Sequence, residues 1–239
     1  GLNREGLGIT DLYSSQKNAI WRIVQNRGAL IDHEVGLGKT LTMVVAAHEM
    51  KRLGIIRKPA ILALKANVRQ IVETYRKAYA GSRIIAPGEN DFTPLKRQQL
   101  FLHIKNNNWD VIILTHDQFG AIQQSPEIQQ KILQQELDNV EADLSTLKDQ
   151  GKDVSKRMLK GLEIRKQNLM VKLKEVLLCL QNRRDEDISF KDLGIDHLFV
   201  DESHKFKNLT FTTRHDRVAG LGNTLGSQKA LNMLFAIRT

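Results

Sequence analysis

Hydrophobic residues between positions 9 and 119 fall into two alternating patterns. Short continuous apolar runs have the length of buried strands, and between them apolar residues recur every three or four positions, as on one face of a helix. These patterns predict strands over residues 28–32, 59–64, 82–86 and 109–115, and helices over residues 15–24, 40–53, 68–79 and 95–106. Strands that alternate with helices are typical of an α/β fold with a parallel sheet.

A different pattern occupies the middle of the chain. Its apolar positions are spaced 4, 3, 4 and 3 apart, as in the seam of a coiled coil: Leu133, Leu137, Val140, Leu144 and Leu147. The seam resumes at Leu159, Leu162, Lys166, Leu169, Leu173, Val176 and Leu180, where Lys166 is its one polar member. Residues 127–153 carry seven acidic and three basic side chains, whereas residues 154–184 carry nine basic and two acidic ones. Because arms of opposite charge attract each other, we predict an antiparallel helical hairpin. A rigid spacer, a partner-docking arm and a nucleic-acid contact remain open as its role.

After the hairpin the α/β pattern returns. Residues 195–200 predict a strand that ends at Asp201, and residues 210–226 predict a surface loop rich in Gly, Thr and Arg. Ser227 is placed to cap a last helix over residues 228–237. The predicted domains are the first part of an α/β lobe at residues 1–120, an inserted hairpin at residues 121–190 and the remainder of the lobe at residues 191–239.

Charge and composition narrow the function classes. The net charge of +9 divides into +7 (17 − 10) for residues 1–120, zero (12 − 12) for residues 121–190 and +2 (7 − 5) for residues 191–239. A basic surface raises affinity for a polyanion such as DNA. No apolar run approaches the ~20 residues that span a membrane. The single Cys179 lies in an apolar helical pattern, so we expect a buried, inert thiol and a reducing cytoplasm.

A candidate phosphate loop follows the first predicted strand. Residues 36–40 read Gly-Leu-Gly-Lys-Thr and lie directly before a predicted helix. Glycines at such a junction let backbone N–H groups surround an anion, and the helix N-terminus adds partial positive charge. Lys39 would then face the β- and γ-phosphates of ATP, and the Thr40 hydroxyl would bind Mg²⁺. The strict pattern has a glycine at position 33, where this chain has His33.

An acidic pair completes the predicted nucleotide site. Asp201 and Glu202 follow the apolar run Leu-Phe-Val, at the edge of a parallel sheet where ligands of α/β proteins bind. We expect Asp201 to hold the Mg²⁺ shell and Glu202 to orient and deprotonate the attacking water.

These motifs resemble those of one enzyme family. Residues 201–204, Asp-Glu-Ser-His, resemble the DExH box of superfamily 2 helicases, and the run Asp-Glu-Ser-His-Lys-Phe-Lys-Asn at residues 201–208 is similar to that of Swi/Snf-related DNA translocases. The phosphate loop of that family reads acidic-acidic-Met-Gly-Leu-Gly-Lys-Thr, which residues 33–40 resemble. The family uses no glycine at the position of His33.

The resemblance also implies roles for residues outside the loop and the box. Gln16 corresponds to the family's upstream glutamine and would contact adenine. The resemblance implies contact to DNA by Thr115 and coupling of the nucleotide and DNA sites by His204. Two interpretations are open for the basic Lys205 and Lys207: contact with a phosphate backbone, or simple solvation. Arg214 and Arg217 lie in the predicted loop, from which they could approach DNA. His116 and Asp117 depart from the family pattern. The segment at residues 64–67 departs from it too, because it lacks the proline that the family has there.

The resemblance covers residues 9–120 and 191–239 and implies a RecA-like P-loop lobe with a central parallel sheet, interrupted by the hairpin. Swi/Snf-related enzymes close ATP between two such lobes and step along duplex DNA without sequence specificity. A second lobe with arginine fingers is expected in the parent protein, so this chain alone should turn over ATP poorly. In bacterial mobile elements and phages similar lobes are joined to adenine DNA methyltransferases. We expect a monomer without a membrane partner.

Two other functions fit parts of the sequence. A nucleotide-switched module that binds DNA or protein would need the loop but not the water-activating Glu202. A nucleic-acid-binding protein without motor activity would explain the basic charge but leave both motifs unexplained. The presence of Glu202 favours the motor.

Overall fold

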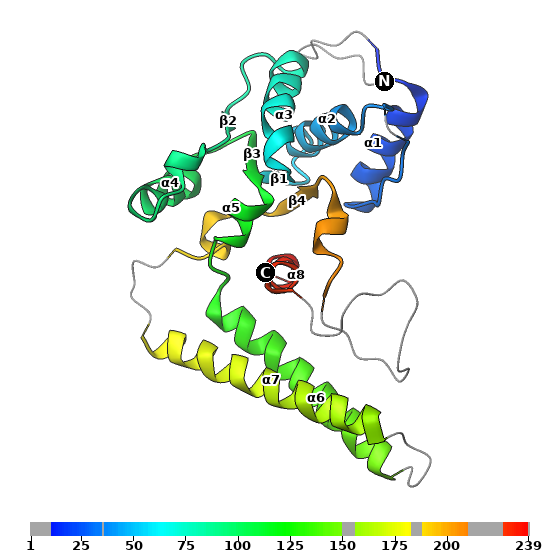
Figure 1. Cartoon of the computed structure of the whole chain (residues 1–239). Helices are drawn as coiled ribbons and strands as arrows, with labels where there is room; N and C mark the ends of the chain where they lie inside the picture. The colour runs from blue at the N-terminus through cyan, green and yellow to red at the C-terminus, as the bar shows by residue number, and fades with distance from the viewer. Residues whose placement is uncertain (1–10, 35, 150–155, 183–187, 210–226, 239) are drawn as a thin grey trace. The chain divides into compact units, whose positions relative to one another are not determined.

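The computed structural model describes residues 11–34, 36–149, 156–182, 188–209 and 227–238 (Figure 1). The chain divides into two compact units. The first comprises Gly1–Ile122 and Asp192–Glu202, and the second comprises Gln123–Lys191 and Ser203–Thr239. The division into an α/β lobe and an insertion stays a prediction.

A parallel sheet forms the centre of the first unit. Its strands are β1 (Pro59–Ala63), β2 (Ile84–Ile85), β3 (Val111–Thr115) and β4 (His197–Val200). They lie in the order β2-β3-β1-β4, and every pair is parallel. Leu62 of β1 stands opposite Leu114 of β3 on one side and Val200 of β4 on the other. The predicted α/β class is confirmed, and the arrangement is consistent with a RecA-like lobe.

Helices connect the strands. They are α1 (Ser14–Asn26), α2 (Lys39–Arg52), α3 (Lys65–Ala78), α4 (Pro94–Asn106) and α5 (His116–Gly120), with short 3₁₀ turns η1 (Glu89–Asp91), η3 (Lys191–Leu193) and η4 (Ser203–Phe206). In Figure 1 helices α1, α2 and α3 lie together on one side of the sheet. All four helices predicted before residue 107 are present.

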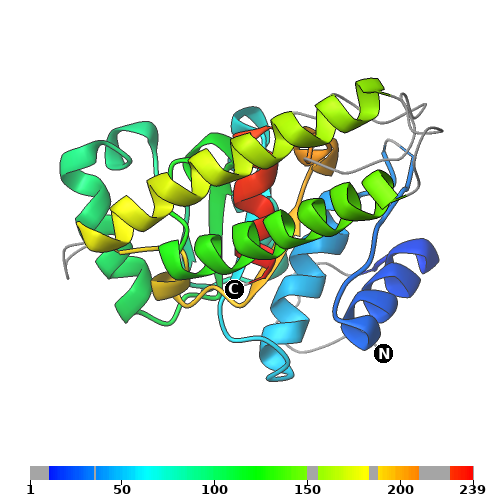
Figure 2. The same ribbon diagram turned by 90° about the horizontal axis from the view of Figure 1, so that it is seen from below.

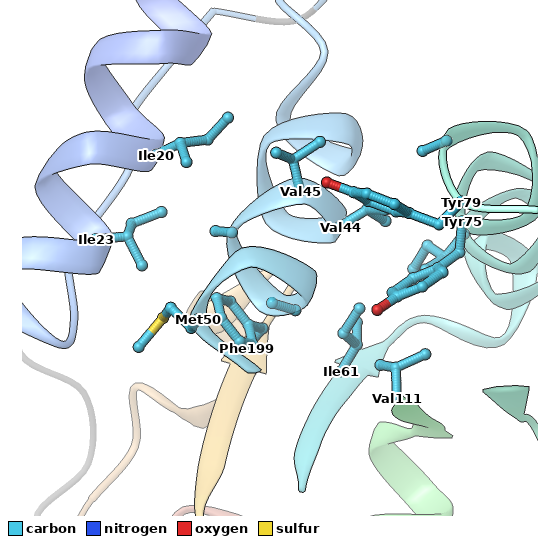
Figure 3. Close-up of a cluster of buried hydrophobic side chains, with 14 of the residues drawn as sticks. Ile20, Ile23, Val44, Val45, Met50, Ile61, Tyr75, Tyr79, Val111 and Phe199 are labelled. Atoms are coloured by element: carbon cyan, nitrogen blue, oxygen red, sulfur yellow. The ribbon is translucent and has the colours of Figure 1, made fainter. Parts of the chain in front are cut away.

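The core of the first unit lies between the sheet and these three helices. Alternate side chains of the strands, Ile61, Val111 and Phe199, point to the same face because strand residues alternate in direction (Figure 3). They meet apolar residues of the helices, among them Ile20 and Met50. All five residues of β1 are buried, as expected of a central strand.

One predicted strand was wrong. Residues 28–32 form no strand and pair with none of the four described strands. The apolar run there has only three members, and Leu30 in its middle is 86% exposed. Because a strand needs a paired backbone and a buried face, this short run cannot sustain one without a neighbour. The segment is an irregular connection between α1 and the Gly-rich loop.

The second unit contains α6 (Pro126–Asp149), α7 (Lys156–Gln181) and α8 (Gln228–Ile237). Both views show α6 and α7 side by side and running in opposite directions (Figures 1 and 2). The seam leucines of α6 are buried in a core that Leu231 and Phe235 of α8 join. That this pair of helices is an insertion into the lobe stays a prediction.

Charge pairs follow the seam between the two long helices. Lys166, its polar member, pairs with Glu141 at 2.8 Å, and Arg165 pairs with Glu136 at 2.9 Å. Burial lowers the pKa of Arg165, and Glu136 opposes that shift. The prediction of a buried thiol was wrong: Cys179 is exposed, because the neighbouring seam positions turn toward α6 and leave it outside.

The end of the second unit matches its prediction. The Ser227 side chain accepts a hydrogen bond from the backbone N–H of Ala230 and so caps α8. The predicted loop at residues 210–226 lies outside the described residues.

Candidate functional site

The Gly36–Thr40 loop enters helix α2 without a side-chain cap. Gly36 and Gly38 have φ values of +94° and +69°, in the left-handed region that glycine adopts without strain. Gly38 is the N-cap of α2 and, having no side chain, provides no side-chain cap for the first-turn N–H groups. Uncapped N–H groups at a helix start, together with the helix dipole, form a binding place for an anion.

Lys39 turns back across this loop. Its ammonium group donates a hydrogen bond to the backbone carbonyl of His33 at 2.6 Å. The two residues lie six positions apart in the chain, so this contact joins the start of α2 to the segment before the Gly-rich loop. His33 thereby contributes its backbone carbonyl, which any residue could supply.

Gln16 fastens α1 to the loop. Its side chain is only 3% exposed, and its amide nitrogen donates to the carbonyls of Leu37 and Gly38 at 3.3 Å each. Its amide oxygen accepts from the N–H of Tyr13 at 2.9 Å. A Cβ atom on Gly38 would lie 2.4 Å from this amide nitrogen. Gln16 therefore holds the loop backbone directly, and its contact with adenine stays a prediction.

Asp201 is held at three points. Its N–H donates to the carbonyl of Leu62 at 2.8 Å, which extends the pairing of β4 with β1. Its carbonyl accepts from Nε2 of His116 at 2.9 Å, and its Oδ2 accepts from Nδ2 of Asn67 at 2.9 Å. A buried imidazole and a half-buried amide thus fix both the main chain and the side chain of this carboxylate.

Sequence reasoning did not assign Asn67 or His116 to this site. Asn67 lies in α3 just after β1, and His116 begins α5 immediately after β3. Both therefore lie at the edge of the sheet where the parallel strands end, which is also where Asp201 follows β4. The signal was available: polar residues directly after strands that pair in parallel.

Glu202 has an unusual backbone. Its φ is +53°, one of two positive values among the described non-glycine residues. Left-handed backbone is uncommon for a residue with a side chain, and such strain concentrates at functional sites. The side chain is exposed at the end of the first unit.

The residues expected to contact DNA lie in different settings. His204 and Lys205 are exposed in η4 of the second unit, and Lys207 follows them, also exposed. The Thr115 hydroxyl accepts from the N–H of Gln118 and caps α5, so its oxygen already has a structural partner. Arg214 and Arg217 lie outside the described residues.

Metal-binding side chains are sparse. Within the part of the chain that the structure describes, no three His, Cys, Asp or Glu residues gather to hold a metal ion.

The comparison with protein families decides the assignment. A family model described as "Probable helicase domain" matches residues 21–239. The chain belongs to this family. A helicase domain implies nucleic-acid binding in general, and the family match includes the loop, Asp201 and Glu202.

Two further findings concern relatives and membrane spans. A search of curated proteins found no match. None of the described helices is both long and apolar enough to cross a bilayer.

Proposed function

We propose that this helicase domain is the ATP-binding motor lobe of an ATP-dependent DNA helicase or translocase. The observation that supports it most is the Gly36–Thr40 loop, whose left-handed glycines lead into an uncapped helix while Lys39 turns into the loop onto the His33 carbonyl. A lysine at a helix start that lacks a side-chain cap suits the phosphates of a nucleotide.

Different groups at the loop would bind the phosphates and the Mg²⁺ of Mg·ATP. The first N–H groups of α2 and the Lys39 ammonium would bind the phosphate oxygens, and Lys39 would exchange its His33 partner for them. The Thr40 hydroxyl and the Asp201 carboxylate would hold the Mg²⁺ shell. When bound, Mg²⁺ neutralises charge that develops on the phosphates during transfer.

Glu202 would orient the attacking water and accept its proton. It directly follows Asp201, whose main chain and side chain are both hydrogen-bonded, and its backbone is left-handed. A passive nucleotide-dependent binding module would need no such carboxylate, so these features favour the motor over that alternative.

DNA is the proposed track. The family match supports nucleic-acid binding, and the net charge of +9 arises outside the predicted hairpin, which favours contact with phosphates. Lys205 and Lys207 are exposed beside His204, which would couple the two sites. On the resemblance to Swi/Snf-related enzymes, the proposal includes duplex DNA as the substrate and a second RecA-like lobe. It also includes a fused DNA methyltransferase as the context, a cytoplasmic location and a monomeric state.

The test uses the full-length parent protein with Glu202→Gln. ATP binding should persist, while DNA-stimulated hydrolysis should fall by about 100-fold or more, because a positioned general base contributes at least that factor. Glu73→Gln, an exposed carboxylate of α3 paired with Arg69, is the matched control and should leave turnover unchanged. Unchanged hydrolysis in Glu202→Gln would refute the assigned role and favour the binding module.

A further inference from the structure

Asn67 occupies a rigid place beside Asp201. Strand β1 ends at Ala63 and helix α3 begins at Lys65, so a single residue separates the strand from the helix. The N–H of Asn67 donates to the carbonyl of Leu64 at 2.8 Å, which tightens this first turn. Because so short a connection allows little freedom, the backbone of Asn67 is held close to the end of β1.

The main chain of Asp201 is already fixed without Asn67. Its N–H is bound to Leu62 and its carbonyl to His116. The remaining freedom of Asp201 is the rotation of its side chain, and the hydrogen bond from Asn67 to Oδ2 sets that rotation.

The chemistry of the donor matters as much as its place. A lysine or arginine at position 67 would neutralise the carboxylate and compete with a cation for it. A carboxamide is neutral, so it orients one oxygen while the negative charge and the second oxygen stay available. This combination suits a carboxylate that must still bind a metal ion, as supporting hydrogen bonds commonly orient metal ligands.

We propose that Asn67 is a positioning residue for the divalent cation: it holds Oδ2 of Asp201 so that the carboxylate is aimed at the metal of the bound nucleotide. This inference rests on the proposed function, in which Asp201 holds Mg²⁺.

The experiment measures nucleotide affinity in the full-length protein with a fluorescent methylanthraniloyl-ATP, first in EDTA and then across a Mg²⁺ titration. Asn67→Ala should leave the affinity in EDTA unchanged, because the loop and Lys39 are intact. The Mg²⁺ concentration for half-maximal tightening should rise about 3- to 10-fold, which is the range for losing one orienting hydrogen bond. Asn67→Leu keeps the bulk but lacks the donor, and it should show the same shift.

Two controls separate the possible failures. Arg69→Ala changes an exposed residue of the same helix and should match the wild type. Asp201→Asn should abolish the tightening by Mg²⁺; if it does not, the proposed metal role of Asp201 is wrong. If Asp201→Asn abolishes tightening while both Asn67 variants keep the wild-type Mg²⁺ requirement, the positioning role is overturned. An equal loss of affinity with and without Mg²⁺ in both Asn67 variants would also overturn it, because that result means a structural role.

Discussion

Replacing Gly38 with alanine tests the contact between helix α1 and the Gly-rich loop. The new methyl carbon would lie 2.4 Å from Nε2 of Gln16 and 3.6 Å from its Cδ. The residue would also have to keep a φ of +69°. Two separate penalties therefore act, one on the backbone and one on the Gln16 side chain.

The two penalties have different sizes. A non-glycine residue in the left-handed region costs about 1–2 kcal/mol. Displacing the buried Gln16 amide breaks its bonds to Leu37 and Gly38, and a buried polar group left unsatisfied costs about 1–3 kcal/mol. Gly38→Ala should thus lower the free energy of unfolding by about 2–5 kcal/mol, the sum of the two terms.

Gly54→Ala is the matched control. Gly54 follows α2 with a φ of +72°, and a Cβ there would meet nothing within 4 Å. This variant carries only the backbone penalty, about 1–2 kcal/mol. The difference between the two variants isolates the contact with Gln16.

The assay is urea unfolding followed by tryptophan fluorescence. The chain has two tryptophans, Trp21 and Trp109, and both belong to the first compact unit, so the signal reports the unit that contains the loop. In a Gln16→Ala background, Gly38→Ala should cost no more than Gly54→Ala, because the clashing amide is gone. Equal destabilisation by Gly38→Ala in both backgrounds would refute the contact.

Two further predictions concern the two cores. Leu144→Ala, at a buried seam position of α6, should lower the free energy of unfolding by about 2–5 kcal/mol. Ser145→Ala, at the exposed neighbouring position, should change it by about 0.5 kcal/mol or less. Far-UV circular dichroism during urea unfolding measures both values, and equal effects would contradict the burial of the seam position. Burial, with a smaller contribution from Asp110, raises the pKa of Tyr75 well above its ordinary 10.0, so the folded state resists deprotonation. The free energy of unfolding that depends on the neutral Tyr75 is fully present below pH 10 and is lost as the pH rises above 10. The urea concentration at the unfolding midpoint of the wild type should therefore decrease when the pH is raised above 10, and that of Tyr75→Phe should decrease less. Equal decreases in the two proteins would contradict the assignment.

Much of the fold could be predicted from local patterns. The apolar runs of β1 and β3 have the length and composition typical of buried strands, and the spacing of the seam leucines is typical of paired helices. The Ser227 cap depends on residues three apart, so it too is visible in sequence. The segment at residues 28–32 failed because strand formation depends on a neighbour, which composition does not encode.

The candidate site likewise has parts that the sequence predicts and parts that depend on the fold. The loop and the acidic pair are local motifs, so the sequence alone suffices to predict them. The contacts of Asn67 and His116 with Asp201 join residues 134 and 85 positions apart, and they exist only because of the parallel strand order. The Gln16 contact likewise depends on how α1 packs beside α2, which no motif states.

The binding of Mg·ATP to this chain tests the nucleotide site most directly. Calorimetry with the wild-type chain should detect binding, and Lys39→Ala should weaken it by about 10- to 100-fold, because a charge-assisted hydrogen bond contributes about 1.5–3 kcal/mol. Lys77→Ala, an exposed lysine at the end of α3, should bind as the wild type does. Equal affinities of the wild type and Lys39→Ala, or no binding by either, would contradict the assignment of residues 36–40 as the phosphate loop.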